Sequence, residues 1–334
     1  MTIYDISEKA GVSIATVSRV LNGNSKVSEK TRQKILAVME ETGYQPNVFA
    51  RGLGLNTMNT IGVMCADSSD IVLASAVYDV EQELHKYQYD VLLCCTGYEA
   101  KEKAKYMNLL LSKRVDALIL VGSSFIEKNM EKNQYIIDAA KEVPVMLVNA
   151  YLDAPNVYCA VCDDREMMRY ASEKFLAQKR EILYLYRSLS YSGRQKIQGI
   201  KDAYTQCGRK LRKDQIVLMK DSSIEDTKRF LQERWEQGKT WDVIMASDDE
   251  LAVGACKFAK VQGLKVPQDM QILGYNNSKI SICSEPEIST VDNHMREAGS
   301  LAVDLLMKIL KKEIVSQKTV VKGEIVPRDT SADL

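Results

Sequence analysis

"TIGVMCADSSDIVLASAVYDVEQELHKYQYDVLLCC" (residues 60–95) contains two strand patterns with a helix pattern between them. Residues 60–66 and 90–95 are short apolar runs typical of buried strands, whereas residues 73–87 carry apolar side chains at helical spacing. A strand, a helix and a second strand at this spacing predict a β-α-β unit with parallel strands.

The same alternation continues to the end of the chain and starts a second time near residue 166. We therefore predict an α/β core at residues 60–334, made of two doubly wound, Rossmann-like lobes. The N-lobe is expected at about residues 60–160 plus 292–322, and the C-lobe at about residues 161–291 plus 323–334. Two such lobes in one chain imply a cleft between them.

Residues 1–46 follow a different pattern, that of three short helices, so a small all-α domain is expected ahead of the core. Thr2, Ser13 and Ser28 are N-cap residues, and Gly11 and Gly43 are helix ends. Residues 47–59 follow Pro46, contain polar residues and read as a linker or hinge.

The second predicted helix, Ile14 to about Leu21, has an apolar stripe of Val17, Val20 and Leu21. Its other face carries short side chains and Arg19, a composition that lets a backbone approach base edges while an arginine bonds guanine. Residues 1–46 hold six basic against five acidic side chains, so charge adds little. On pattern alone, a core helix and a DNA-reading helix remain equally open.

Composition excludes several other classes. Lys+Arg and Asp+Glu balance at 45 each, no apolar run could span a bilayer, and the N-terminus lacks a signal-peptide pattern, so a cytoplasmic protein is expected. Cys159 and Cys162 have the spacing of half a metal site without a second pair, and we interpret them as core cysteines. No catalytic constellation, metal site or cofactor is predicted; the aspartate pairs at 163–164 and 248–249 do not by themselves argue for catalysis.

"TIYDISEKAGVSIATVSRVLNG" (residues 2–23) and "VSEKTRQKILAVMEETGYQPNVFARGL" (residues 27–53) resemble the DNA-binding head of the lactose-repressor/galactose-repressor (LacI/GalR) family. "ASDDELAVGA", "GLKVPQDMQILGYNN" and "PEISTVDNHMREAGSLAVDLL" are similar to the family's core, which is itself like periplasmic sugar-binding proteins. The resemblance covers nearly the whole chain.

The resemblance implies that the second helix lies in the major groove of DNA. It also implies that residues 47–53 form a hinge helix on DNA, with Leu53 inserted into the minor groove. Gly52 departs from that pattern, because glycine costs a helix about 1 kcal/mol relative to alanine. The DNA-binding residues implied are Ser13, Ile14, Ala15, Thr16, Ser18, Arg19, Asn22, Asn47 and Leu53.

The resemblance also implies an effector site between the lobes. Lys196 takes the place of the family's usual arginine, Asn276 that of an aspartate, and Asp248 that of an asparagine. These changes put a typical hexose effector in doubt, since lysine lacks the planar fork of arginine. Tyr186, Tyr191 and Tyr275 are candidates for stacking on a ligand or for simple packing. The effector residues implied are Asn149, Tyr191, Lys196, Asp248, Tyr275 and Asn276.

These observations predict a sequence-specific transcriptional regulator, an allosteric repressor whose homodimer binds a palindromic operator in double-stranded DNA. A small molecule, a sugar or related metabolite, would switch it from between the lobes. The chain ends at Leu334 without a further heptad helix, so a dimer is expected rather than a tetramer. A solute-binding protein for transport is the alternative, and an enzyme on the same scaffold is the third hypothesis.

Overall fold

The computed structural model describes residues 1–21, 26–44, 57–220, 223–332 and 334. The head contains the three expected helices, α1 (Ile3–Ala10), α2 (Ile14–Leu21) and α3 (Glu29–Thr42). Their caps are those predicted: the Asp5 carboxylate accepts from the Thr2 backbone N–H at 2.7 Å, and the Thr31 N–H donates to the Ser28 hydroxyl at 3.3 Å. Local capping chemistry therefore fixes where these helices begin.

The head has a small core of its own. Ile6, Ala10, Val17, Val20 and Ile35 are buried together, one or two from each helix. Each helix thus turns a single stripe inward, and its other side chains remain on the surface.

The N-lobe contains a six-stranded parallel sheet with the order β11-β5-β4-β3-β1-β2. Its strands are almost wholly apolar, because helices cover both faces of the sheet. They are β1 (Thr60–Cys65), β2 (Asp90–Cys95), β3 (Ala117–Val121), β4 (Val145–Val148), β5 (Val157–Cys162) and β11 (Lys318–Val321).

The C-lobe sheet repeats this order as β12-β10-β9-β8-β6-β7, with β12 antiparallel to β10 and the other strands parallel. Two lobes with one strand order confirm the predicted pair of doubly wound units. The strands are β6 (Ile182–Tyr186), β7 (Ile216–Leu218), β8 (Val243–Ala246), β9 (Gln271–Tyr275), β10 (Thr290–Asp292) and β12 (Glu324–Val326).

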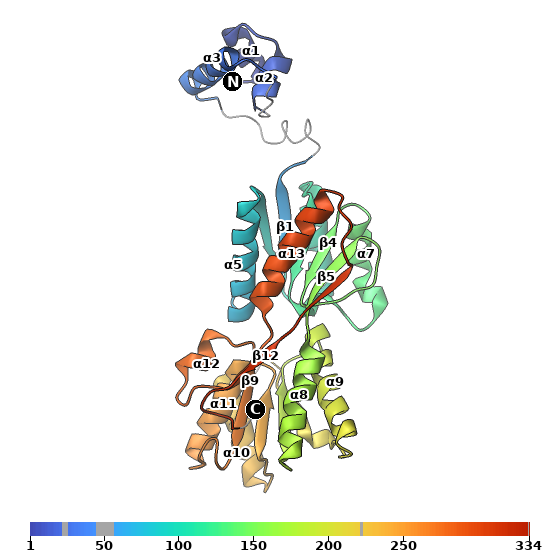
Figure 1. The fold of residues 1–334 in the computed structure, drawn as a ribbon, viewed down its shortest axis with the longest axis vertical. Coiled ribbons are helices and arrows are strands. Elements are labelled where there is room, and N and C mark those ends of the chain that lie inside the picture. The colour runs from blue at the N-terminus through green and yellow to red at the C-terminus, as the bar shows by residue number, and fades with distance from the viewer. Residues whose placement is uncertain (22–25, 45–56, 221–222, 333) are drawn as a thin grey trace.

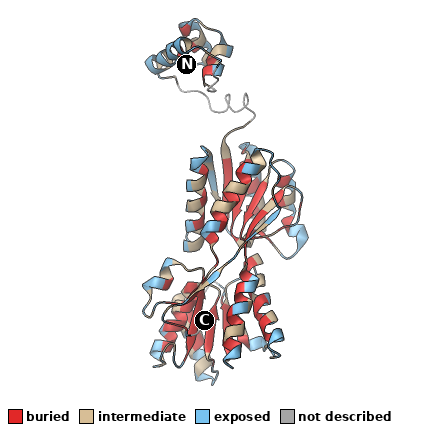
Figure 2. Cartoon of the chain, in the orientation of Figure 1, coloured by how far each residue is buried: buried red, intermediate tan, exposed pale blue. Residues whose placement is uncertain are grey.

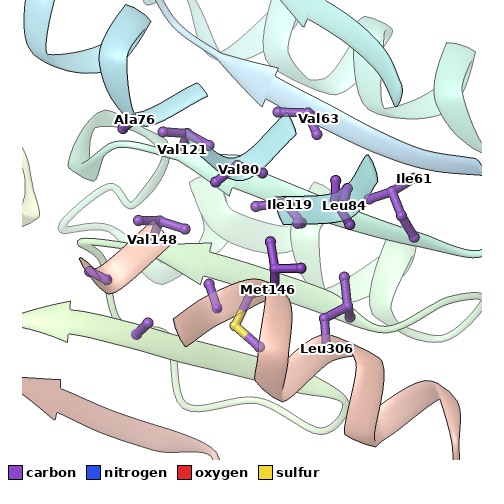
Figure 3. Packing of buried hydrophobic residues seen from close by; sticks show 14 of the residues in the cluster. Ile61, Val63, Ala76, Val80, Leu84, Ile119, Val121, Met146, Val148 and Leu306 are labelled. Atoms are coloured by element: carbon purple, nitrogen blue, oxygen red, sulfur yellow. The ribbon is translucent and has the colours of Figure 1, made fainter. Parts of the chain in front are cut away.

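Helices form the outer layers of both lobes (Figure 1). In the N-lobe, α5 (Ile71–Lys86) and α13 (Met295–Leu310) cover one face of the sheet, and Figure 3 shows the core between them and the strands. The helices α6 (Ala100–Ser112) and α7 (Gln134–Ala140) cover the other face. In the C-lobe, α8 (Asp164–Ala177) and α9 (Tyr191–Gln206) lie opposite α10 (Ile224–Glu236) and α11 (Asp249–Val261). The short α12 (Lys279–Cys283) follows β9. Figure 2 shows burial concentrated along both sheets.

The chain crosses between the lobes three times: from β5 to α8, from β10 to α13, and from β11 to β12. Figure 1 shows these connections side by side between the two lobes. Because short connections join them, the lobes form two bodies around a common hinge.

Candidate functional site

The surface of α2 divides as the sequence pattern predicts. Val17 and Val20 are buried, whereas Ser13, Ala15 and Arg19 are exposed and the side chain of Ile14 is 39% exposed. Thr16 and Ser18 are half-buried, and the Ser13 hydroxyl accepts from the Thr16 N–H at 3.2 Å, which caps the helix. The helix thus presents short side chains and one arginine outward on a rigid support.

Three residues of the implied DNA interface lie outside the described residues: Asn22, Asn47 and Leu53. The hinge helix expected at residues 47–53 also lies there. Their roles remain predictions.

A cavity of about 180 Å³ lies between the two lobes. Its walls come from the residues that follow the carboxyl ends of strands in both sheets, where ligands bind in open α/β sheets. The N-lobe contributes Asp70, Val72, Leu73, Tyr98, Gly122, Ser123, Ser124 and Asn149; the C-lobe contributes Arg187, Ser188, Ser190, Ser192, Gly193, Lys196, Ser247, Asp248 and Asn276; Asn293 and Met295 come from the β10–α13 connection.

Lys196 lies in the wall of this cavity and is only 5% exposed. Its Nζ donates to the Ser247 carbonyl at 2.9 Å and lies 3.4 Å from the centre of the Tyr275 ring. Burial lowers the pKa of Lys196, and the carboxylates of Asp164 and Asp248 partly oppose this shift. An ammonium has three donors, so Lys196 retains donor capacity toward the cavity.

Asn149 and Asn293 supply acceptors. Their side chains are 7% and 2% exposed, and the Oδ1 atom of each is buried without a hydrogen-bond partner. Asn293 Nδ2 donates to Asn276 Oδ1 at 3.4 Å, so the side-chain amides of these two cavity residues lie close together. Buried carbonyl oxygens without partners are costly, so these two amides mark polar positions in the cavity wall.

Both carboxylate oxygens of Asp248 already have partners. One oxygen accepts from the Leu251 N–H at 3.0 Å and caps α11, and the other pairs with Arg187 Nε at 2.9 Å. Arg187 also reaches Glu250 at 2.8 Å. Sequence reasoning missed Arg187; its position directly after a buried strand, beside a predicted cleft, was the available signal.

Among the described residues that line the cavity, none is one of the three candidate tyrosines. Tyr275 is fully buried, its ring lies against the Lys196 ammonium, and its hydroxyl donates to Asp164 at 2.6 Å. Tyr186 is stacked on Tyr184, and Tyr191 packs against the N-lobe core. Packing therefore accounts for each ring.

The lobes touch at one side of the cavity. The Ser123 hydroxyl donates to the Ser190 hydroxyl at 3.0 Å, and Arg194 donates to the Ile126 carbonyl at 3.4 Å. These contacts join the end of β3 to the start of α9, so a shift of one lobe against the other must break or remake them.

A larger hollow, about 570 Å³, lies on the surface between α8 and α9. Its arginines are already paired: Arg165 with Asp202 at 2.6 Å, and Arg169 with Glu166 and Glu173. Its lining comes mostly from α8 and α9 and is charged or polar, so we regard it as a charged surface. Among the described residues, no cluster of three or more metal-ligating side chains occurs, and no helix is long and apolar enough to cross a membrane.

A capped helix-turn-helix head joined to a two-lobed α/β core defines a class of DNA-binding regulators built on a periplasmic-binding-protein-like core. The chain matches "Bacterial regulatory proteins, lacI family" over residues 2–47, and "Periplasmic binding proteins and sugar binding domain of LacI family" over residues 58–329. It belongs to the LacI family of transcriptional regulators.

Relatives support this along the full length. An HTH-type transcriptional regulator of Lachnoclostridium phytofermentans is 51% identical over 333 residues, covering 99% of both chains. Catabolite control protein A of Priestia megaterium is 32% identical over 327 residues, covering 96% of both chains. In fold, the chain is similar to the Lac repressor dimer bound to operator and the anti-inducer ONPF, with a TM-score of 0.84 at 24% identity, covering 99% of this chain and 98% of that one.

Proposed function

We propose that this chain is a homodimeric transcriptional repressor whose two heads read a palindromic operator, and whose operator affinity is switched by a neutral polyhydroxyl effector bound between the lobes. The observation that carries the proposal is the outward face of α2, where Ile14, Ala15 and Arg19 stand exposed on a helix anchored by Val17 and Val20.

The outward side chains of α2 and of its N-cap each suit one kind of contact. Arg19 can bond guanine O6 and N7 with two donors, and Ile14 suits the methyl group of thymine. Ser13, Thr16 and Ser18 have hydroxyls for phosphate oxygens, which position a helix in the groove without reading sequence. Two-fold pairing of heads turns one such half-site into a palindrome.

The test is operator selection with the full chain, followed by titration of the selected duplex at fixed salt. Arg19→Ala should weaken binding by about 1–3 kcal/mol and relax the preference at one base pair of each half-site. The matched control is Lys9→Ala, which removes an exposed charge from the last turn of α1. Equal affinities for Arg19→Ala and the unmodified chain would refute this assignment.

The effector part rests on the cavity. Its formal charges balance, since Asp70 and Asp248 face Arg187 and Lys196, and this favours a neutral ligand. The unpartnered oxygens of Asn149 and Asn293 require donors, which hydroxyl groups supply. The transcription regulator CelR has been solved as a cellobiose complex, with a TM-score of 0.71 to this chain at 21% identity.

A thermal-shift screen of the full chain against neutral sugars, polyols, sugar phosphates and small acids tests the effector class. A ligand at a hundredfold above its Kd stabilises the folded chain by about 2.7 kcal/mol. We expect neutral hits that Asn149→Ala abolishes, with exposed Asn108→Ala as the matched control. Hits confined to anions would overturn the neutral class while leaving the DNA-binding proposal intact.

We infer that the chain acts on DNA in the cytoplasm and catalyses no reaction. The carboxylates of one acidic pair in the core already have partners: Asp249 accepts from Thr290 and Ser278, and Asp248 caps α11. The solute-binding alternative is disfavoured by the head, which a transport protein has no use for.

A further inference from the structure

Cys65 and Cys95 are the last residues of two neighbouring strands. β1 and β2 run parallel in a register that pairs Cys65 directly with Cys95. Directly paired residues point to the same face of a sheet, and here the two Sγ atoms are 3.7 Å apart. The Thr96 N–H donates to the Cys65 carbonyl at 2.9 Å and holds the two strand ends together.

The two thiols differ in their surroundings. Cys65 is buried in the core between the sheet and the helices α5 and α13, whereas Cys95 is exposed. Burial and the neighbouring Cys95 raise the pKa of Cys65 to about 12, so this sulfur remains protonated at neutral pH. An oxidant from solvent therefore meets Cys95 first.

We propose that Cys65 and Cys95 form a reversible intrachain disulfide when the protein meets a hydroperoxide. The Cys95 sulfur attacks the peroxide, which is reduced to an alcohol or water, and becomes a sulfenic acid. The Cys65 sulfur then displaces hydroxide from Cys95, a proton from the Cys65 thiol completes water, and the S–S bond forms. Two thiols lose two electrons in total, and the peroxide accepts them.

The geometry suits a reversible bond. Neighbouring strands lie about 4.8 Å apart, which falls within the Cα separation of about 4.4–6.8 Å that disulfides span. Within the part of the chain that the structure describes, β2 is an edge strand that pairs with β1 alone, so it can shift to bring the sulfurs into bonding distance. A bond at a solvent-exposed position is of the kind that thiols reduce readily.

The bond would also act on the effector cavity. Cys65 is followed by the loop to Asp70, which caps α5, and Cys95 by the loop to Tyr98; both Asp70 and Tyr98 line the cavity. A disulfide would tie the origins of these loops together.

The test exposes the reduced full chain to hydrogen peroxide, blocks remaining thiols and digests it with trypsin. We expect the peptide of residues 52–86 linked to that of residues 87–101, a monomer band on a non-reducing gel, and loss of the link on adding dithiothreitol. Because the Cys95 side chain is exposed, Cys95→Ser should fold and should abolish the link.

Cys94 is the matched control. It lies in the same tryptic peptide but packs on the opposite side of the sheet, so Cys94→Ser should form the link as the unmodified chain does. A link that requires Cys94, a link only between chains, or peroxide treatment that leaves Cys95 as sulfinic acid without any link would each overturn the proposal.

Discussion

Replacing Lys196 by methionine tests how the cavity holds its buried cation. Methionine has similar length and no charge, so it keeps the packing and removes the ammonium. The lost hydrogen bond to Ser247 is worth about 1.5–3 kcal/mol and the lost contact with the Tyr275 ring about 2 kcal/mol. The substitution also removes the cost of burying an ammonium, which is several kcal/mol and offsets these two losses. At pH 7, the two chains should therefore differ in unfolding free energy by no more than about 2 kcal/mol.

The dependence on pH is the sharper result. Burial lowers the pKa of Lys196 in the folded chain, so between that value and the unfolded value of about 10.4 the unfolded chain binds more protons. Stability due to Lys196 then rises with pH, by at most about 1.4 kcal/mol per pH unit. The unfolding free energy of the unmodified chain minus that of Lys196→Met should consequently increase with pH.

The assay is urea unfolding of both chains at pH values from about 7.5 to about 10.4, the pKa of an unfolded lysine. Lys201→Met, which removes an exposed ammonium from the same helix, corrects for the general effect of lost charge. A difference that stays flat or falls as pH rises would refute the reasoning, because it would mean that the folded chain does not disfavour the charged form of Lys196.

Three further changes test the packing. Ile35→Ala should destabilise the head by about 2–5 kcal/mol, because Ile35 is fully buried, and calorimetry should place the loss in the head transition alone. Gly199→Ala should destabilise the C-lobe in urea, because an added Cβ would lie 2.1 Å from the Arg165 carbonyl; Gly299→Ala, where the nearest atom is 3.2 Å away, should stay within about 1 kcal/mol of the unmodified chain. Tyr275→Phe removes a hydroxyl donor from a buried carboxylate and should cost about 1–3 kcal/mol in the same assay. Equal stabilities for the two glycine variants, or an unchanged head transition, would contradict these assignments.

The features that local chemistry dictates could be read from the sequence. The head helices begin directly after Thr2, Ser13 and Ser28 because a capping side chain bonds the backbone three residues away. The sheets could be predicted from apolar runs such as residues 60–66, because strands of this composition need helices packed on both faces. The short β10 and the helix α12 were not predicted, since three to five residues carry too little periodicity.

The cavity depended on contacts that no local pattern contains. Asn149 was implied by the resemblance and follows β4 in the structure, but its unpartnered oxygen depends on what packs around it. The pairing of Arg187 with Asp248 joins residues 61 positions apart, and Lys196 lies against Tyr275 because two strands and a helix converge there. Such contacts follow from the packing of the lobes rather than from spacing along the chain.

The central claim is that occupancy of the cavity controls DNA binding, and its most direct test is the dissociation constant of the selected operator with and without a saturating hit from the thermal-shift screen. If the cavity is coupled to the head, the effector changes operator affinity, typically by about 5–150-fold, and linkage then requires that operator change effector affinity by the same factor. The account predicts equal factors in both titrations. An effector that binds in the cavity and leaves operator affinity unchanged would contradict it.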